Sequence, residues 1–461
     1  MKKTWQSFKE NINGQAVAVC GIGRNNLPVI EQLLGCGARV FACDKRTREE
    51  LGETAETLEA KGVTLYLGET YLDHLSDMAL ILRTPGMKPY LPPFEAARAA
   101  GIPVTSEMEL FFDYCPAPIY AVTGSDGKTT TTTIIAGLLK AAGKKVFLGG
   151  NIGRPLLPLI EEVGEDDVAV VELSSFQLTR MTKSPHVAVV TNVAPNHLDW
   201  HTDMQEYIDA KRNLIAYQTA ADRAVLNADN ETTAAFADGA PAGQVFRFSR
   251  RTEQTEGAWV NGEGVLCLSH GGVTTEVVAA ADILIPGVHN VENYLAAIAA
   301  VWGEVDPALI ADYARTFGGV PHRCELVRTR RGVRWYNDSI GSSPSRTIAG
   351  LRAFDRKVIL IAGGYDKHIP YAPLGEVAAE TVKHAILLGA TAPAIETAIR
   401  ANSDLPITRV STMQEAVDAA DRLAGDGDIV FLSPASASFD MYKNFEERGE
   451  HFRTLVAALP L

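Results

Sequence analysis

One stretch, residues 119–140, limits most strongly what this chain can fold into. Its first part, Ile119 to Thr123, is apolar and predicts a short buried strand, and the turn Gly124-Ser125-Asp126-Gly127 follows. Lys128 and Thr129 then open a predicted helix that runs through Leu139. Helix starts offer unpaired backbone N–H groups and a positive dipole end, and glycines let such a backbone wrap closely around phosphate oxygens. The stretch therefore predicts a nucleotide-phosphate site.

The residues of this loop have distinct expected roles. Lys128 is expected to neutralise the terminal phosphates, and the Thr129 hydroxyl to face a magnesium ion. The full P-loop pattern has a glycine six residues before the lysine, where this chain has Val122. The simplest alternative is an ordinary strand–turn–helix corner, which the Gly-Lys-Thr sequence after a β-branched strand disfavours.

The N-terminal region reads as a nucleotide-binding unit. A strand over Gln15 to Cys20 is followed by Gly21-Ile22-Gly23, a helix through about Cys36, and a second strand that ends in Asp44. This is the layout of a dinucleotide-binding unit. Asn26 replaces the third glycine, so the pattern favours a Rossmann-like half that holds some nucleotide diphosphate, with Asp44 near the ribose or base.

Strand and helix patterns alternate along most of the chain and predict three α/β domains with mainly parallel sheets. The segment Tyr114 to Pro118 suggests one connection, and Gly318 to His322 suggests a second boundary with a hinge. We therefore predict three domains, over 1–115, 116–319 and 320–461. Short alternating segments over Gln244 to Val278 predict a small antiparallel part in the second domain.

Composition excludes several classes of function. The 461 residues carry a net charge of −13, which argues against nucleic acid as the partner because phosphate backbones require clustered Lys and Arg. No apolar run approaches the roughly 20 residues of a membrane span, and the first residues have no signal-peptide core. The six cysteines are scattered without metal-ligand spacing, as in reduced packing thiols. A cytoplasmic location and a monomer are expected.

Two polar side chains follow apolar strands of the second domain. Glu172 ends the strand that begins at Val168, and His197 follows the strand Val187 to Thr191. Parallel neighbouring strands finish at one edge of a sheet, so both are expected beside the phosphate loop. Glu172 suits magnesium, which prefers oxygen ligands. His197 is equally well explained as a strand-end histidine bonded to backbone, and Lys211 as a solvated helix lysine.

The whole chain resembles the Mur ligase family, ATP-dependent enzymes that form amide bonds in cytoplasmic peptidoglycan precursor synthesis. The resemblance rests on segments that recur in the family's order: TGSDGKTTT, ELSSFQL, NVAPNHLDWH, YIDAK, HNVEN and PHR. The family has a shortened phosphate loop, which accounts for Val122. Further segments are similar to the branch of the family that adds a D-amino acid, D-glutamate, to UDP-N-acetylmuramoyl-L-alanine: GIGRNN, TPG, TSEMEL, GGNIG, NDS, GGYDK and SPASASFDMYKNFEERG.

The resemblance implies roles for individual residues. Lys128, His197 and Lys211 would be catalytic, and Lys211 would be carbamylated. Two magnesium ions would be held by Thr129, Glu172, His197 and Lys211. ATP would be bound by Gly124, Ser125, Asp126, Gly127, Lys128, Thr129, Thr130, Asn290, Asn293, Arg323 and Asp338. The UDP substrate would be bound by Arg24, Asn25, Asp44, Lys45, Arg46, Thr84, Pro85, Gly86 and Asn151, and D-glutamate by Ser342, Lys367, Ser438 and Phe445.

Three positions depart from the family pattern. Asp126 replaces Asn in the phosphate loop, Asn196 replaces the Asp that precedes the histidine, and Ile340-Gly341 replace a Lys-Ala pair after Asp-Ser. The last change removes one cation beside the expected D-glutamate site, so the acceptor is less well defined than the ligase chemistry.

Other classes of function remain as alternatives. A sibling ligase such as folylpolyglutamate synthase shares the ATP domain. A nicotinamide-dependent oxidoreductase would explain Gly21, Gly23 and Asp44 but not the phosphate loop or Glu172. A nucleotide-binding regulator without catalysis would explain Asp126 and Ile340.

Overall fold

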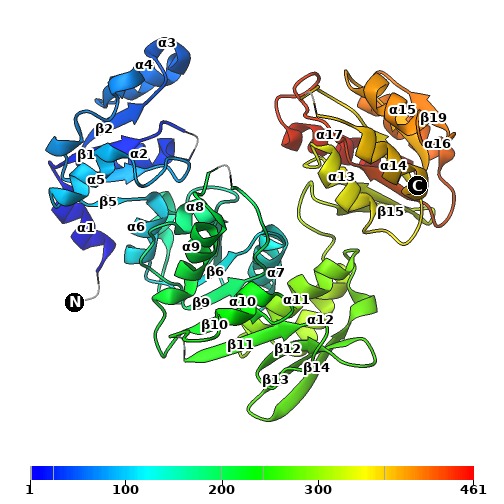
Figure 1. Ribbon diagram of the computed structural model, residues 1–461, viewed down its shortest axis with the longest axis horizontal. Coiled ribbons are helices and arrows are strands. Elements are labelled where there is room, and N and C mark those ends of the chain that lie inside the picture. Colours follow the sequence, from blue (N-terminus) through cyan, green and yellow to red (C-terminus); the bar gives the residue numbers. More distant parts are fainter. Residues whose placement is uncertain (1–2, 24, 199, 242, 368, 461) are drawn as a thin grey trace. The chain divides into compact units, whose positions relative to one another are not determined.

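The computed structural model describes residues 3–23, 25–198, 200–241, 243–367 and 369–460. Contacts divide the chain into two compact units. Unit 1 comprises Met1–Ala280 with Glu292–Tyr313, and unit 2 comprises Ala281–Val291 with Ala314–Leu461. Figure 1 labels their helices and strands, and each unit is described here by itself.

The first sheet of unit 1 has five strands in the order β3-β2-β1-β4-β5, and all of its pairings are parallel. This is the order of a Rossmann-like half, as predicted. The strands are β1 (Ala16–Cys20), β2 (Arg39–Asp44), β3 (Thr64–Leu67), β4 (Leu80–Arg83) and β5 (Val104–Thr105). The helices are α1 (Trp5–Ile12), α2 (Leu27–Gly35), α3 (Arg48–Leu51), α4 (Glu53–Ala60), α5 (Pro92–Ala99) and α6 (Glu107–Tyr114), with short 3₁₀ turns η1 (Gly68–Thr70) and η2 (Leu75–Asp77).

The second sheet has nine strands in the order β14-β13-β12-β11-β10-β9-β6-β8-β7. They are β6 (Ile119–Thr123), β7 (Val146–Gly150), β8 (Val168–Glu172), β9 (Val187–Val190), β10 (Arg223–Asn227), β11 (Gln244–Ser249), β12 (Gly257–Val260), β13 (Val265–His270) and β14 (Val273–Ala279). The helical elements are α7 (Lys128–Ala141), η3 (Leu157–Glu162), α8 (Ser175–Leu178), α9 (Met204–Ala216), α10 (Glu231–Ala235), η4 (Ala280–Asp282), α11 (Val288–Val301) and α12 (Pro307–Thr316).

The predicted antiparallel part is smaller than expected. β11 pairs in parallel with both β10 and β12, and only β12, β13 and β14 are antiparallel. β11 follows the crossover through α10, a connection that returns the chain in the same direction. Helix α11 begins at Val288, so Asn293 lies in its second turn.

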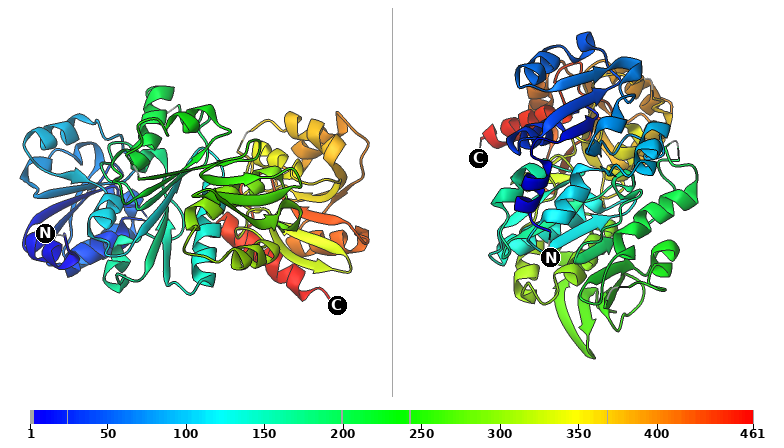
Figure 2. Two further views of the ribbon diagram at one scale, coloured as in Figure 1. Left: turned by 90° about the horizontal axis from the view of Figure 1, so that it is seen from below. Right: turned by 90° about the vertical axis from the view of Figure 1, so that its left-hand side faces the viewer.

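The sheet of unit 2 has six strands in the order β15-β16-β20-β17-β18-β19. β15 and β16 form an antiparallel hairpin, and the other pairings are parallel. Buried side chains cover both faces of this sheet, and the helices lie on both sides of it (Figure 2). The strands are β15 (Glu325–Arg330), β16 (Val333–Asn337), β17 (Val358–Ala362), β18 (Val382–Leu387), β19 (Ile407–Arg409) and β20 (Ile429–Leu432); the helices are α13 (Pro344–Leu351), α14 (Ala372–Thr381), α15 (Ala392–Arg400), α16 (Met413–Leu423) and α17 (Phe445–Ala458).

Three adjacent parallel strands position the phosphate loop. β6 lies between β8 and β9, with Val122 opposite Glu172 and Thr123 opposite Val190. Because parallel strands end at the same edge, Gly124, Glu172 and Thr191 come together there. Among the described residues, no helix combines the length and the hydropathy needed to cross a membrane.

Candidate active site

The loop after β6 requires its glycines. Gly124 and Gly127 have φ values of 152° and 78°, which L side chains rarely adopt. A Cβ atom on Gly124 would overlap the Thr191 hydroxyl, and one on Gly127 would overlap the Asn293 side-chain oxygen. The backbone of this turn is therefore packed against neighbouring side chains and leads directly into α7 at Lys128.

Side chains from the end of β9 hold the loop in place. The carbonyl oxygen of Asp126 accepts hydrogen bonds from Thr191 Oγ1 at 2.6 Å and from Asn192 Nδ2 at 3.2 Å. The Asp126 N–H donates to Asn192 Oδ1 at 3.0 Å. Asp126 itself is exposed, so its additional carboxylate stays in contact with solvent.

Two lysines converge on the carbonyl groups of this loop. Lys128 Nζ donates to the carbonyl oxygens of Gly124 and Ser125, each at 3.0 Å, and Lys211 Nζ donates to Gly124 O at 2.7 Å. Lys211 is only 1% exposed, and its nitrogen lies 4.6 Å from the centroid of the Tyr207 ring. The interpretation of Lys211 as a solvated helix lysine is therefore wrong. Burial, and secondarily the charge of Lys128, holds the pKa of Lys211 well below its usual range.

Glu172 is a buried carboxylate with an unsatisfied oxygen. Its Oε1 accepts from Asn151 Nδ2 at 2.7 Å, whereas Oε2 has no hydrogen-bond partner within the described part of the chain. A buried oxygen without a partner is costly, and a bound cation would remove that cost.

These residues fit magnesium better than a softer metal. Among the described residues, no group of three His, Cys, Asp or Glu side chains gathers as a metal site. Magnesium keeps several water ligands and needs few protein groups, so Glu172 with the hydroxyl of Thr129 at the start of α7 suits that ion.

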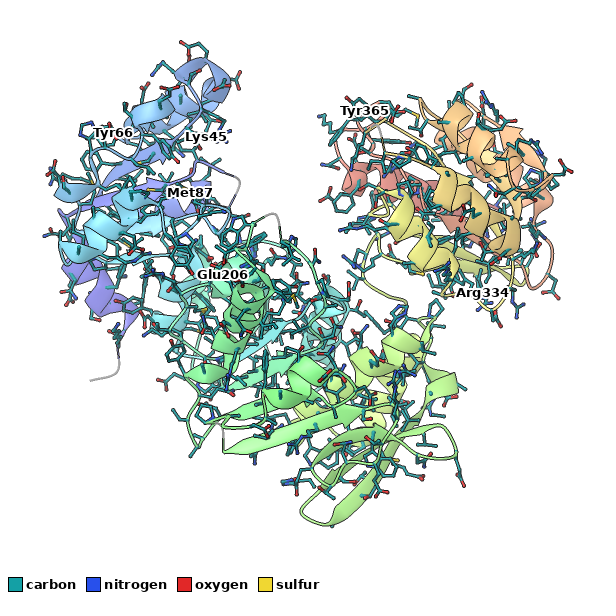
Figure 3. The ribbon with its side chains drawn as sticks, viewed as in Figure 1. Lys45, Tyr66, Met87, Glu206, Arg334 and Tyr365 are labelled. Atoms are coloured by element: carbon teal, nitrogen blue, oxygen red, sulfur yellow. The ribbon has the colours of Figure 1, made fainter. Side chains whose placement is uncertain are left out.

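Two histidines, His197 and His201, follow β9, and only His197 was predicted as a site residue. His197 has a φ of 54°, is exposed, and meets the Phe176 ring edge-on at 4.9 Å. His201 is buried, and its Nε2 lies 2.9 Å from Ser175 Oγ. Burial lowers the pKa of His201. Its Nδ1 lies 3.6 Å from the carboxylate of Glu206 on α9, which Figure 3 labels. His201 follows His197 by four residues, and this spacing is the sequence feature that could have identified His201 as a second candidate.

Other side chains complete the loop's surroundings. The Tyr207 hydroxyl donates to Ser125 Oγ at 2.8 Å, because the Ser125 hydroxyl gives its own proton to the carbonyl oxygen of Ala194. Asn293 accepts from Thr131 Oγ1 at 3.1 Å, which places it beside the first turn of α7. Thr129 and Thr130 are the next residues of that turn and are partly exposed.

The predicted uridine diphosphate site lies at the carboxyl ends of β1, β2 and β4. Asp44 accepts from the Ile22 N–H at 2.7 Å and from the Arg46 guanidinium at 2.9–3.0 Å. Burial opposes the charged form, but the bonds from Arg46 and Ile22 outweigh it, so the pKa of Asp44 is lowered. Lys45, labelled in Figure 3, and Asn25 are exposed at this edge, and Arg24 lies outside the described residues.

The turn Thr84-Pro85-Gly86 closes the same edge. The Thr84 N–H donates to the carbonyl oxygen of Cys20, and a Cβ on Gly21 would lie 2.7 Å from Thr84 Cγ2. The carbonyl oxygen of Gly86 accepts from Trp200 Nε1 at 3.0 Å. This bond connects the first sheet's turn with the segment that carries His197 and His201.

Unit 2 contains the remaining predicted ATP contacts. Asp338 Oδ2 accepts from Ser433 Oγ at 2.8 Å, and Oδ1 accepts from the Cys324 N–H at 3.1 Å. Burial raises the pKa of Asp338 to about 6, which the Arg323 guanidinium opposes. Asn290 Nδ2 donates to the carbonyl oxygen of Pro286 at 2.6 Å.

The predicted D-glutamate residues also lie in unit 2. Lys367 Nζ lies 3.3 Å from the carbonyl oxygen of Ser342. Ser438 is buried, and Phe445 opens α17. Arg448 was not predicted as a site residue. It is 1% exposed and donates hydrogen bonds to the carbonyl oxygens of Ser339, Ser436 and Ala437 at 2.8–3.1 Å. It fixes the backbone immediately before Ser438.

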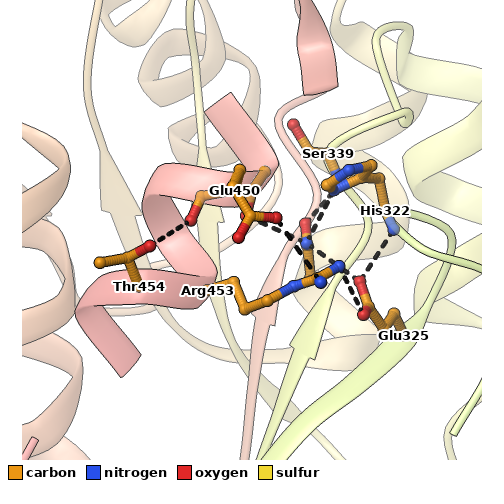
Figure 4. A network of polar contacts seen from close by, with 8 residues as sticks. His322, Glu325, Ser339, Glu450, Arg453 and Thr454 are labelled. Carbon is orange, nitrogen blue, oxygen red and sulfur yellow. Dashed lines mark hydrogen bonds and ion pairs between the residues drawn. The ribbon is translucent and has the colours of Figure 1, made fainter. Parts of the chain in front are cut away.

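A polar network anchors the segment that enters unit 2 (Figure 4). Glu325 accepts from the His322 N–H at 2.9 Å and from Arg453 at 2.7 Å. Asn337 Nδ2 lies 3.1 Å from His322 Nδ1. The residue before Arg323 is thereby tied to β15, β16 and α17.

Comparison with protein families matches three regions in order. Residues 15–106 match the description "Mur ligase MurD-like, N-terminal domain", residues 122–301 match "Mur ligase middle domain", and residues 322–436 match "Mur ligase, glutamate ligase domain".

Relatives of known description cover the whole chain. The UDP-N-acetylmuramoylalanine--D-glutamate ligase of Acetivibrio thermocellus is 53% identical over 466 residues, covering 100% of both chains. The ligase of the same name from Clostridium novyi is 48% identical, covering 99% of both.

Solved structures share the fold. The MurC ligase (UDP-N-acetylmuramate-alanine ligase) of Thermotoga maritima aligns with a TM-score of 0.57 at 17% identity, over 96% of this chain and 99% of that one. The MurF ligase of the same organism, in complex with ADP, aligns with a TM-score of 0.54 at 18% identity, over 97% and 96%.

Proposed function

The chain belongs to the Mur ligase family, and we propose that it is the ATP-dependent ligase that joins D-glutamate to UDP-N-acetylmuramoyl-L-alanine in peptidoglycan precursor synthesis. The observation that carries this proposal is the 53% identity, over the full length of both chains, to a UDP-N-acetylmuramoylalanine--D-glutamate ligase. The intact phosphate loop with Lys128 supports a catalytic protein rather than a regulator that only binds nucleotide.

The reaction follows from the chemistry of a carboxylate, whose oxygen is a poor leaving group. The substrate carboxylate attacks the γ-phosphorus of ATP, the bond to ADP breaks, and an acyl phosphate forms. The amino group of D-glutamate then attacks the acyl carbon, phosphate leaves, and the amine loses a proton. Lys128 and Arg323 would spread the charge on the transferring phosphoryl group. Gly124, Ser125, Asp126, Gly127 and Thr130 would line the turn that holds the phosphates.

The magnesium site is part of the proposal. Thr129, Glu172, His197 and a carbamylated Lys211 would hold two magnesium ions. Bound magnesium would supply charge neutralisation at the phosphates. The orphan oxygen of Glu172 supports a cation at this place. Carbamylation would turn the buried amine of Lys211 into an anion, which suits a site of divalent cations.

Substrate contacts complete the assignment. Asn290, Asn293 and Asp338 would contact ATP. The uridine diphosphate would be held by Arg24, Asn25, Asp44, Lys45, Arg46, Thr84, Pro85 and Gly86, and the muramoyl peptide by Asn151. D-glutamate would contact Ser342, Lys367, Ser438 and Phe445. We also propose domain boundaries at 115/116 and 319/320, and a monomer that acts in the cytoplasm.

One experiment tests the proposal directly. The chain is incubated with ATP, magnesium, UDP-N-acetylmuramoyl-L-alanine and D-glutamate, and phosphate release is measured together with the mass of the UDP product. We expect release only when both substrates are present, with one D-glutamate residue added. Release that is independent of the UDP substrate, or a product without D-glutamate, would overturn the proposal.

A further inference from the structure

A cavity of about 280 Å³ lies in unit 1, between the first sheet's layer and the segment after α8. Its lining includes Arg83, Arg98, Arg180, Glu109, Thr182 and Tyr217. None of these residues is among the predicted active-site residues. The side chains come from β4, α5, α6 and the ends of α8 and α9, so distant parts of the chain build the cavity together.

Within the part of the chain that the structure describes, Arg83 is a buried cation that donates hydrogen bonds only to neutral acceptors. It is 3% exposed, and it donates to the carbonyl oxygens of Pro85, Met87 and Thr179 at 3.5, 3.0 and 3.4 Å. Burial lowers the pKa of Arg83. A buried guanidinium is costly unless an anion compensates it.

The other two arginines share one carboxylate. Glu95 accepts from Arg98 at 2.8 Å and lies 3.2 Å from Arg180. Arg180 also stacks on the Tyr90 ring at 4.6 Å, and its φ of 66° is strained for a residue with a side chain. The strained backbone of Arg180 thus places a third guanidinium group at this cavity.

The remaining carboxylate does not balance the arginines. Glu109 accepts from Ser106 Oγ at 3.0 Å, and burial raises its pKa, which disfavours its charged form. Three guanidinium groups therefore face two carboxylates, one of which resists ionisation, in a chain whose net charge is −13. Positive charge is therefore concentrated at this cavity although the chain as a whole is negatively charged.

We propose that this cavity binds a small phosphate-bearing anion, separately from the phosphate loop. Guanidinium groups match the geometry of phosphate oxygens and form paired hydrogen bonds with them. A monohydrogen phosphate can also donate its proton to Glu109 or Glu95, which sulfate cannot do. The anion would join β4 and α5 to the segment Thr179–Thr182.

Isothermal titration of the full chain with inorganic phosphate tests this site. Saturating UDP-N-acetylmuramoyl-L-alanine and a non-hydrolysable ATP analogue with magnesium are present throughout, so that the predicted active site is occupied. We expect one phosphate per chain, with weaker binding of sulfate at equal ionic strength. Absence of phosphate binding, or phosphate binding that appears only in a parallel titration without those two ligands, would overturn the proposal.

Variants locate the bound anion. Arg83→Met and Arg98→Met should each weaken phosphate binding at least tenfold, whereas Arg251→Met, which removes an exposed arginine elsewhere in unit 1, should not change it. Glu95→Gln should strengthen binding at least threefold. If Arg83→Met does not fold, the opposite effects of Arg98→Met and Glu95→Gln on phosphate affinity still test the site. Equal affinities in all of these variants would contradict the site.

The source of the phosphate group is distinguished by a second titrant. Glycerol 3-phosphate should bind more tightly than inorganic phosphate if the cavity serves an organic phosphate monoester, because the remaining volume would be filled. Equal affinities for glycerol 3-phosphate and inorganic phosphate would identify free phosphate as the ligand. Hydrogen exchange should slow at residues 92–100 and 179–182 with either titrant, and exchange unchanged there would overturn the assignment.

Discussion

The side-chain nitrogen of Lys211 lies 2.7 Å from the carbonyl oxygen of Gly124, within the turn that leads to α7. The amine is buried, and its pKa is lowered by burial and by Lys128. A neutral amine is the form that reacts with carbon dioxide. The arrangement therefore favours the neutral amine that the proposed carbamylation of Lys211 needs.

Lys211→Ala should reduce ligation by about 10²-fold or more, because it removes the proposed carbamate beside the phosphate loop. Small carboxylic acids such as acetate or formate should restore part of the activity. Arg212→Ala, at the exposed neighbouring position on α9, is the matched control and should retain activity. Removing carbon dioxide from the buffer should also depress the unmutated enzyme until bicarbonate is added. Full activity without carbon dioxide would contradict carbamylation.

Lys128→Met should lower the rate of phosphate release by about 10²–10³-fold, because it deletes the cation that faces the transferring phosphoryl group. The protein should remain folded, since Lys128 is only partly buried. Lys140→Met, at an exposed position of the same helix, should behave as the unmutated enzyme. Activity of the Lys128→Met variant within a few-fold of the unmutated enzyme would exclude the assigned role.

Glu172→Gln should raise the magnesium concentration for half-maximal activity at least tenfold, since it removes the charge of a carboxylate whose Oε2 has no hydrogen-bond partner among the described residues. Gln keeps the shape and can still accept from Asn151. Glu162→Gln, an exposed position, serves as the control. The measurement is a magnesium titration at saturating ATP, and a curve identical to that of the unmutated enzyme would argue against metal binding at Glu172.

Asp338 should make the stability of unit 2 depend on pH. Burial raises its pKa from 3.8 to about 6, so the folded form binds a proton more tightly than the unfolded form. The resulting stabilisation is complete below pH 4 and is lost as the pH rises through 6, by up to about 3 kcal/mol. Asp338→Asn should therefore raise the denaturation midpoint at pH 8 relative to the unmutated chain, more than at pH 4. Asp404→Asn, an exposed change, should show no such difference.

Local patterns in the sequence predicted much of this fold. Apolar runs located β1, β6 and β8 within one residue of their ends. The carboxyl-edge position of Glu172 followed from parallel pairing alone. The direction of β11 did not follow, because alternating segments do not distinguish a hairpin from a crossover.

Burial of single polar residues was harder to predict. Lys211 lies on the buried face of α9 with Tyr207, Ala210 and Leu214. Helical spacing therefore indicated that Lys211 is buried, although its charge is typical of an exposed residue. Arg448 is buried by contacts with Ser339, 109 residues earlier, and no local pattern reports such a contact. The arginine cavity arises in the same way, from elements far apart in the chain.

Ile340 and Gly341 remove a cation expected beside the D-glutamate site, so the identity of the amino acid that the enzyme adds is the property to measure. The most direct measurement supplies ATP, magnesium and UDP-N-acetylmuramoyl-L-alanine with a panel of D- and L-amino acids, and follows phosphate release with the mass of each product. We expect efficient phosphate release and addition of a single residue with D-glutamate, and at most traces with L-glutamate or D-aspartate. A clear preference for any other amino acid, or equal release with all of them, would contradict this expectation.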